Sequence, residues 1–493
     1  MFHPNPTLLI DLYKLSHRNQ YPQGTEYVYS TWTARTTRMP SIDHVVVFGV
    51  QMAVRKLESY FYEQFFSKSL ELILKDYVRF VKHVLGDQNP ETQHISDLHA
   101  LKCLPLEICA LEEGTLCPVR VPSLTIENTD PRFFWLTNYV ESLLSTMLWP
   151  AYTSATIANQ YYEILEHYAL ETVGNADFVP FQGHDFSFRG LSSLETAITS
   201  GMAHLAVGFA GTDTAPAIQG LEYYYGANIE KELVGTSIPA TEHSVMCAYG
   251  EDGGDMASFK RLITEVHPTG FISIVSDTWD LWDVIGRVLP ALRGDILDRD
   301  GRVVIRPDSG DPVKILCGDP EGKTALEKAG VVEALWALFG GTLSPQGYKV
   351  LDSHIGTIYG DSITLERAGE ICQRLKAKGF ASINAVLGIG SYAYQYVTRD
   401  TFGQAMKSTY CEVSGKPRLL FKDPKTDNGV KKSQRGRVSV IMGPNGLEFK
   451  DGLIRGDQMP GNLLRTVFKG GITYNPTTLA KIRDKLKNQR LEV

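Results

Sequence analysis

The chain of 493 residues is 21% charged and 43% hydrophobic, a balance typical of a soluble globular protein with two or three domains. Its net charge of -7 argues against a general binder of nucleic acids or anionic membranes. The seven cysteines include no C-x-x-C pair, so neither a zinc site nor a disulfide framework is indicated. No basic leader precedes an apolar core, and no apolar run reaches the ~18 residues of a membrane span. We therefore expect a cytoplasmic protein with reduced thiols.

The first part of the chain mixes predicted strands and helices. A short extended or helical lead-in is expected at 5–21, and it carries the polar group Asp11, Tyr13, Lys14 and His17. Strands are predicted at 27–35, 45–48, 108–119 and 123–126, and helices at 50–86, 132–149 and 154–173. The last of these helices is expected to begin on a Ser154 cap. Its aromatic and leucine content favours core packing or a dimer surface over a ligand site.

From residue 177 onward, apolar runs that end in polar or small residues recur. They lie at 178–189, 205–213, 233–243, 271–277, 303–311, 355–361 and 384–391. Helical patterns separate most of them: 191–207 opens with a capping box of Ser192 and Glu195, and 364–378 begins at Thr364 and meets Gly379. Repeated strand–turn–helix units predict a parallel sheet, and their number favours a β/α barrel over an open sheet.

The most informative of these runs is Val303–Asp311. Its strand should end near Arg306, because Pro307 cannot donate to a sheet ladder. Arg306 and Asp308 would then lie together at the carboxyl end of a strand, which suits an anionic ligand that is phosphorylated and bound to a metal. In a barrel the same rim would collect Asp185, Arg189, Asp213, His243, Asp277, Arg306, Asp308 and Asp361. The alternative is that each of these residues is only an N-cap or a turn former.

The pattern changes after residue 399. Strands are predicted at 406–413 and 419–421, a hairpin at 438–449 and a basic helix at 481–490. Between them, the loop 422–437 carries Lys422, Lys431, Lys432, Arg435 and Arg437, which either bind phosphates or form a solvated surface. We expect residues 1–176 and 392–493 to form one discontinuous α+β domain beside a barrel of residues 177–391, because neither terminal part looks like a complete core.

Several motifs occur in a fixed order along the chain. They are GHDFSFRG at 183–190, GTDT at 211–214, SIPATEHS at 237–244, SD at 276–277, IRPDSG at 305–310 and YGD at 359–361. Further motifs are Asp11-x-Tyr13-Lys14, ENTDP at 127–131, TRD at 398–400, Lys407 and FKDP at 421–424. Together they resemble the nicotinamide phosphoribosyltransferases, members of the type II phosphoribosyltransferase family, over nearly the whole chain.

The resemblance implies transfer of phosphoribose from phosphoribosyl pyrophosphate to the ring nitrogen of nicotinamide, a step of NAD salvage that gives nicotinamide mononucleotide and pyrophosphate. It also implies an irregular β/α barrel of the type II kind and a head-to-tail homodimer with shared active sites. Mg2+ would be held mainly by the pyrophosphate, and ATP would act as co-substrate or activator. Departure of pyrophosphate leaves positive charge at the ribose, so clamping of anions matters more than a strong base.

The resemblance also implies individual roles. Phe186 would stack on the nicotinamide ring, opposite Tyr13 of the partner subunit. Asp213 would accept a hydrogen bond from the carboxamide, and its charge would repel nicotinate. His243 resembles a phosphorylated histidine, with Asp277 available to orient its ring. Catalytic roles are implied for His243, Asp277, Arg306 and Asp308, and substrate contacts for Asp11, Tyr13, Phe186, Arg189, Asp213, Ser237, Ser273, Gly360, Asp361, Gly390, Ser391, Arg399, Lys407, Lys422 and Lys431. No metal ligands are assigned.

Three positions depart from the family's pattern. The glycine-rich loop reads 388–392 GIGSY, Gly356 stands where arginine is frequent, and Ser187-Phe188 replaces Gly-Tyr. These changes are expected to affect ATP coupling and phosphate affinity more than the transfer itself. The alternatives are the same fold acting on nicotinate, which Asp213 disfavours, and a non-catalytic binding protein, which would lose the charged rim. Nucleic-acid binding through 422–437 is a third alternative, disfavoured by the absence of interleaved aromatics.

Overall fold

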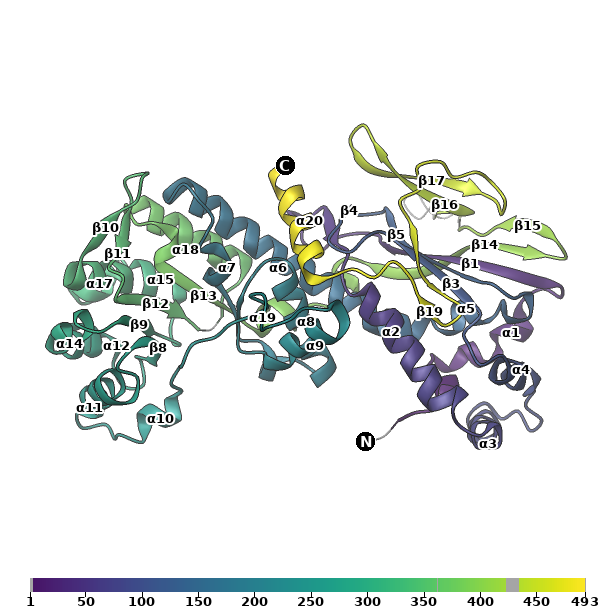
Figure 1. Ribbon diagram of the computed structural model, residues 1–493, viewed down its shortest axis with the longest axis horizontal. Coiled ribbons are helices and arrows are strands. Elements are labelled where there is room, and N and C mark those ends of the chain that lie inside the picture. Colours follow the sequence, from purple (N-terminus) through teal and green to yellow (C-terminus); the bar gives the residue numbers. More distant parts are fainter. Residues whose placement is uncertain (1–2, 361, 423–433, 493) are drawn as a thin grey trace. The chain divides into compact units, whose positions relative to one another are not determined.

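The computed structural model describes residues 3–360, 362–422 and 434–492, and the chain divides into two compact units (Figure 1). Unit 1 comprises residues 1–156, 223–226 and 397–493, and unit 2 comprises residues 157–222 and 227–396. In the described part of the chain, no helix combines the length and the apolar character that crossing a bilayer requires.

Unit 2 is built on a parallel sheet of six strands in the order β7-β6-β13-β12-β9-β8. The strands are β6 (Gly183–Asp185), β7 (Gly211–Thr212), β8 (Gly270–Val275), β9 (Gly301–Arg306), β12 (Ile355–Tyr359) and β13 (Ala385–Ile389). Their central side chains, such as Val303 and Ile305, are fully buried. Strand β9 ends at Arg306, as the lack of an N–H on Pro307 predicts.

The sheet curls, and one irregular segment, residues 236–241, is hydrogen-bonded to both of its edges. At one edge the N–H of Thr212 donates to the carbonyl of Thr236 at 2.9 Å. At the other, the N–H of Ser273 donates to the carbonyl of Pro239 and its carbonyl accepts from Thr241, both at 2.9 Å. The predicted irregular β/α barrel is therefore confirmed.

Helices connect the strands of this barrel. They are α7 (Val179–Gln182), α8 (Leu194–Ala206), α9 (Ala215–Tyr225), α10 (His243–Cys247), α11 (Gly254–Arg261), α12 (Leu281–Asp283), α13 (Leu289–Ala291), α14 (Arg293–Leu297), α15 (Pro312–Cys317), α16 (Ala325–Ala329), α17 (Val331–Phe339), α18 (Leu365–Ala377) and α19 (Ser391–Tyr394), with a small hairpin of β10 (Gly341–Leu343) and β11 (Lys349–Leu351). Helix α18 begins as predicted, because the Thr364 side chain accepts from the N–H of Arg367.

Three predictions in this unit were wrong. Leu205 and Ala206 finish helix α8 instead of opening a strand, because the helix continues until Gly208, whose φ of 123° lies outside the helical region. The helix is capped by Ser193, which accepts from the N–H of Thr196, and not by the predicted box of Ser192 and Glu195. Residues 233–243 contribute isolated bridges to the sheet edges but no regular strand.

Unit 1 contains an antiparallel sheet of seven strands in the order β15-β14-β1-β5-β3-β18-β19. Its strands are β1 (Thr25–Ala34), β3 (Leu106–Ala110), β5 (Pro122–Asn128), β14 (Gln404–Val413), β15 (Lys416–Leu419), β18 (Arg465–Lys469) and β19 (Ile472–Thr473). Two further pairs are β2 (His44–Val46) with β4 (Leu116–Pro118), and β16 (Arg437–Gly443) with β17 (Gly446–Leu453), the predicted hairpin.

The helices of unit 1 include α2 (Val50–Phe61), which contacts β18 and β19, and the terminal helix α20 (Leu479–Glu492), which was predicted. Shorter ones are α1 (His17–Gln20), α3 (Leu70–Phe80), α4 (Gln93–Leu101) and α5 (Leu136–Tyr139). The predicted break between helices near 150 was wrong, because a single helix, α6 (Glu141–Thr172), continues through Pro150. Ala151, Ser154 and Ala155 are almost completely buried around this point, so packing overrides the lost backbone donor.

Candidate active site

The predicted rim residues of unit 2 follow the carboxyl ends of neighbouring parallel strands. Phe186 comes after β6, Asp213 after β7, Asp277 after β8, Asp308 after β9 and Gly360 after β12. Because the strands are parallel, these ends meet at one edge of the sheet. Three further predicted residues lie in the adjoining segments: Ser237 in the segment 236–241, His243 as the first residue of α10, and Ser391 as the first residue of α19. Asp361 lies outside the described residues.

Arg306 and Asp308 form a bidentate ion pair at the centre of this edge. Arg306 Nη2 lies 2.9 Å from Asp308 Oδ2, and Nε lies 3.2 Å from Oδ1. The guanidinium carbon also lies 5.1 Å from the centre of the Phe186 ring. Gly360 packs against the pair so closely that a Cβ there would be 2.0 Å from Asp308 Oδ1. The sequence therefore brings a fixed cation, a carboxylate and an aromatic face together, as expected.

Asp277 contacts both the Asp308 turn and His243, through different oxygens. Its Oδ2 accepts from the N–H of Asp308 at 2.8 Å and from the N–H and hydroxyl of Ser309 at 2.7 and 2.6 Å. Its Oδ1 lies 3.4 Å from Nε2 of His243. The Asp277 side chain is only 4% exposed, whereas that of His243 is 49% exposed, so a buried carboxylate faces an accessible imidazole.

Asp213 is held by two donors. Ser237 Oγ donates to Asp213 Oδ1 at 2.5 Å, and His184 Nε2 lies 3.1 Å from the same oxygen. Burial raises the pKa of this carboxyl, but the hydrogen bonds of His184 and Ser237 and the charge of Arg306 outweigh it, so the pKa lies below the ordinary value. His184 was not among the predicted site residues, although it stands beside Asp185 in the GHDF motif.

Asp185 lies at the carboxyl end of β6, as predicted, but its side chain does not reach the surface of this edge. Its side chain is fully buried, with Oδ1 accepting from the N–H of Ser187 at 2.9 Å and Oδ2 accepting from the hydroxyl of Thr212 at 3.1 Å. Successive side chains of a strand point to opposite faces, so Asp185 turns away from the face of its neighbours His184 and Phe186. Asp185 therefore stabilises the turn after β6.

The remaining predicted residues of unit 2 have fewer contacts. Arg189 is exposed on the 3-10 turn Phe188–Gly190. Ser273 lies inside strand β8, 4% exposed, and its buried hydroxyl makes no hydrogen bond within the described residues. Gly390 precedes α19 and has open space where a side chain would stand. Gly356 lies near the start of β12, roughly 13 Å along the strand from Gly360 at ~3.3 Å per residue.

Unit 1 carries the other predicted contacts. Asp11 Oδ2 accepts from the hydroxyl of Ser142 at 2.6 Å, and the neighbouring Tyr13 side chain is exposed. Burial, Arg35 and Lys422 lower the pKa of Lys407, in that order of effect, so three cations lie near one another. Arg35 was missed, because a lone arginine after a strand gives no local signal.

The other cations of this unit differ from one another. Arg399 is exposed and lies 3.4 Å from Asp400. Arg437, for which phosphate binding and a solvated position were both considered, pairs with Glu127 at 2.8 Å and lies over the Tyr29 ring at 5.2 Å. Lys431 and Lys432 lie outside the described residues.

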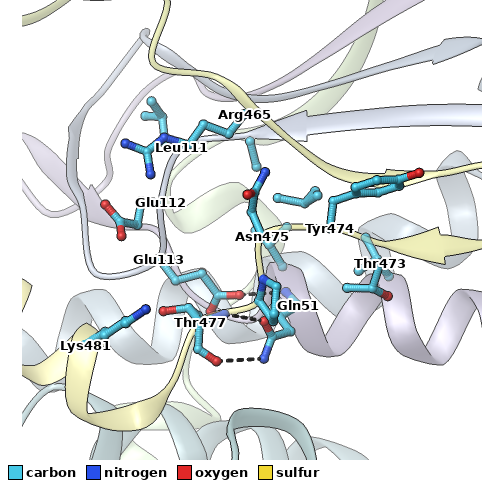
Figure 2. Close-up of a pocket in the computed structure, with 15 residues that line it drawn as sticks. Gln51, Leu111, Glu112, Glu113, Arg465, Thr473, Tyr474, Asn475, Thr477 and Lys481 are labelled. Carbon is cyan, nitrogen blue, oxygen red and sulfur yellow. Dashed lines mark hydrogen bonds between the residues drawn. The ribbon is translucent and has the colours of Figure 1, made fainter.

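A separate cavity of about 180 Å³ lies entirely within unit 1 and contains none of the predicted site residues (Figure 2). On its floor, Glu113 accepts from the N–H groups of Gly49 and Gln51 at 2.8 and 2.6 Å, at the start of helix α2. Burial outweighs these hydrogen bonds and raises the pKa of Glu113 to about 7. Arg465 and Lys481 line the cavity with apolar residues of α2 and β3, but its hydrogen bonds serve the helix start, so we assign it no chemistry.

The described side chains do not form a metal site by themselves. Among the residues that the structure describes, no three His, Cys, Asp or Glu side chains are grouped as a metal site. Asp277 and Asp308 lie close together, but Asp308 is paired with Arg306. This arrangement fits Mg2+ only in its usual mode with nucleotide-type substrates, in which phosphate oxygens and water supply most ligands.

A curled parallel sheet with an arginine–aspartate pair and an aromatic ring at its carboxyl edge, in a chain that also forms an antiparallel sheet, defines a type II phosphoribosyltransferase fold. The crystal structure of human nicotinic acid phosphoribosyltransferase shares this fold, with a TM-score of 0.60 at 17% identity over 98% of this chain and 94% of that one. Nicotinate-nucleotide pyrophosphorylase from Pyrococcus furiosus gives a TM-score of 0.58 at 15% identity, covering 100% and 98% of the two chains. Identities this low establish the fold alone.

The chain belongs to the nicotinate phosphoribosyltransferase (NAPRTase) family, which matches residues 181–472. Residues 5–108 match the N-terminal domain of nicotinamide phosphoribosyltransferase. A nicotinamide phosphoribosyltransferase of Acinetobacter baylyi is 47% identical over 99% of this chain and 98% of its own. One from Mycoplasma pneumoniae is 36% identical over 88% of this chain and 95% of its own. The resemblance noted in the motifs is thereby confirmed.

Proposed function

We propose that this protein transfers the phosphoribosyl group of phosphoribosyl pyrophosphate to the ring nitrogen of nicotinamide, releasing pyrophosphate and forming nicotinamide mononucleotide for NAD salvage. The observation that carries the proposal is the ionised Asp213 held at the rim beside Phe186 and Arg306, in a chain 47% identical over nearly its whole length to a nicotinamide phosphoribosyltransferase. An ionised carboxylate accepts from a carboxamide N–H and repels the carboxylate of nicotinate.

The rim residues divide the work of the transfer. The Phe186 ring stacks on the pyridine, with Tyr13 of the partner subunit on the other face. Arg306 and Asp308 bind the phosphoribosyl group, and the already nucleophilic pyridine nitrogen attacks the ribose carbon as pyrophosphate leaves. Cationic side chains offset the negative charge that develops on the leaving pyrophosphate, and this stabilises the transition state. Arg189 lies by the amide and the phosphoribosyl group, and Ser273 is a further substrate contact. The 5'-phosphate is held by Gly360, Asp361, Gly390 and Ser391, and other phosphates by the partner's Arg399, the partner's Lys407, the partner's Lys422 and the partner's Lys431.

Mg2+ is part of this proposal, held mainly by the pyrophosphate. When bound, it neutralises charge on the leaving group. The proposal also includes a homodimer with shared active sites, which Asp11 and Tyr13 would complete, and a cytoplasmic location. The exposed Tyr13 ring and the positive charge around Lys407 support such sharing, because a shared site needs a ring face for the pyridine and positive charge for the phosphates.

ATP coupling through His243 is the finer part of the proposal. Nε2 of His243 faces Asp277, so Nδ1 is the nitrogen left to accept a phosphoryl group: its bond to the γ-phosphorus forms as the bond to ADP breaks. The exposure of the imidazole supports access by a nucleotide. Asp277 orients the ring, as a carboxylate does for a histidine nucleophile.

The test is nucleotide formation by the purified protein with Mg2+ and phosphoribosyl pyrophosphate, comparing nicotinamide with nicotinate, each with and without ATP. Product from nicotinamide supports the proposal, and a higher rate with ATP supports the role of His243. Product from nicotinate alone would keep the fold and overturn the substrate. No product from either would leave a non-catalytic binding protein as the better hypothesis.

A further inference from the structure

We propose that His184 is a positioning residue which, together with Ser237, orients the Asp213 carboxylate to select an amide over an acid on the pyridine ring. This inference rests on the proposed function, because it concerns the acceptor substrate of the same transfer. It adds His184 and Ser237 as a specificity-determining pair that acts through Asp213, the side chain proposed to contact the amide.

Both donors converge on one oxygen of Asp213. Ser237 Oγ lies 2.5 Å from Oδ1 and His184 Nε2 lies 3.1 Å from it. In the part of the chain that the structure describes, Oδ2 accepts no hydrogen bond. The two hydrogen bonds to Oδ1 therefore fix the orientation of the carboxylate, even though the side chain is 43% exposed. Oδ2 remains able to accept a hydrogen bond from a ligand.

The imidazole of His184 is itself fixed by packing. Its residue pairs with Gly211 across strands β6 and β7, and a Cβ at Gly211 would be 2.7 Å from Nδ1. On another side, the Phe186 ring centre lies 4.5 Å from the imidazole centre at an interplanar angle of 41°. Phe186, proposed to stack on the pyridine, thus packs on His184, which also contacts Asp213. His184 therefore contacts both side chains that are proposed to bind the pyridine substrate.

The chemistry sets the direction of each hydrogen bond. An ionised carboxylate only accepts, so Nε2 of His184 carries the proton and donates to Oδ1. The carboxamide of nicotinamide then donates to Oδ2, whereas nicotinate has no donor there at neutral pH. Without His184 the carboxylate keeps its charge but can turn toward water, so the contact with the amide should weaken.

Steady-state kinetics of His184→Ala test this with both acceptors. Losing a hydrogen bond to a charged group should raise KM for nicotinamide roughly tenfold. KM for phosphoribosyl pyrophosphate should change by less than about twofold. The preference for nicotinamide over nicotinate should fall as KM for nicotinamide rises. His184→Gln, whose side-chain N–H can approach the same oxygen, should recover most of the preference.

A matched control is His354→Ala. His354 forms a similar histidine–aspartate contact in the same unit, with Nδ1 2.6 Å from Asp352 Oδ1, but it precedes β12 at the opposite end of that strand from Gly360. This variant should leave the preference between the two acceptors unchanged.

An unchanged preference in His184→Ala would overturn the inference, as would equal losses in His184→Ala and His184→Gln. A wild-type protein that forms no product from nicotinamide would refute the proposed function instead. In that case calorimetric titration with nicotinamide decides the inference separately: binding by the wild type no tighter than by His184→Ala overturns it, and tighter binding sustains it.

Discussion

The side chain of Asp277 accepts a hydrogen bond from the backbone N–H of Asp308 at 2.8 Å, and this contact ties the end of strand β8 to the turn after β9. The hydroxyl of Ser309 donates to the same oxygen at 2.6 Å. The other oxygen faces His243 at 3.4 Å. One buried carboxylate therefore holds the turn that bears the Arg306–Asp308 pair and also faces the accessible histidine.

Exchange of Asp277 should separate these two tasks. Asparagine retains one acceptor oxygen for the turn but presents an NH2 group to His243, whereas alanine removes both contacts. We expect Asp277→Asn to lower the ATP-stimulated rate roughly tenfold, with a smaller loss of transfer without ATP, because only the contact with His243 is reversed. The measurement is the rate of nicotinamide mononucleotide formation with and without ATP.

Asp277→Ala serves as the comparison and should lower both rates. If asparagine and alanine gave the same pattern, the division of labour between the two oxygens would be wrong.

Gly360 offers a second prediction, because its lack of a side chain makes room for the central ion pair. A Cβ would be 2.0 Å from Asp308 Oδ1 and 3.0 Å from Arg306 Nε. Gly360→Ala must therefore displace the pair, and we expect kcat/KM for phosphoribosyl pyrophosphate to fall about a hundredfold, or ~3 kcal/mol of transition-state binding.

The matched control is Gly369→Ala, on helix α18, where an added Cβ meets nothing within 4 Å. Alanine there should keep activity and stabilise the helix by up to ~1 kcal/mol. Full activity of Gly360→Ala would show that the ion pair is not needed in its observed geometry.

A third prediction concerns Lys407, whose lowered pKa reflects burial and the nearby cations Arg35 and Lys422. A site that already concentrates positive charge should bind an anion, so Lys407→Gln should raise KM for phosphoribosyl pyrophosphate roughly tenfold. KM for nicotinamide should stay nearly constant. Lys450→Gln, on the exposed face of β17, is the control with the same change of charge. If both variants raised KM for phosphoribosyl pyrophosphate equally, Lys407 would act only through the net charge of the protein and not as a local phosphate contact.

Much of this site could be predicted from local patterns. The end of strand β9 follows from the β-branched run before Pro307, and the polar turn after it placed Arg306 and Asp308 correctly. The parallel order of the strands then made it reasonable that Asp213 and Asp277 would reach the same edge. These inferences succeed because they depend on residues adjacent in sequence and on one general property of parallel sheets.

The failures share a different cause. His184 stands in the GHDF motif, but it acquires its place from pairing with Gly211 and its partner Asp213 lies 29 positions away, so the motif alone does not reveal its contact. Helix α6 passes through Pro150 because burial of its neighbours overrides a local rule. Asp185 resembled the other polar candidates at the strand ends, but strand alternation turned its side chain inward. Each depends on tertiary contacts that composition and periodicity do not contain.

The last prediction concerns stability and starts from Glu113, whose pKa burial raises to about 7 from an ordinary 4.5. Because the folded state prefers the protonated carboxyl, its stabilising contribution is fully present below about pH 4.5 and is lost as the pH rises through about 7. At ~1.4 kcal/mol per pKa unit, the full change is about 3 kcal/mol. Glu113→Gln cannot titrate, so its stability should lack this dependence.

Unfolding of the wild type and of Glu113→Gln in urea between pH 5 and pH 8 measures the difference. Other titrating groups change the free energy of unfolding of both proteins equally as the pH changes. Only the difference in this free energy between the two proteins therefore reports on Glu113. The glutamine variant should be less stable at every pH, because its NH2 group cannot accept from the N–H of Gly49 or Gln51. The advantage of the wild type should shrink as the pH rises. A gap that widened would mean that Glu113 stabilises helix α2 as an ionised cap, and that hydrogen bonding outweighs burial at this position.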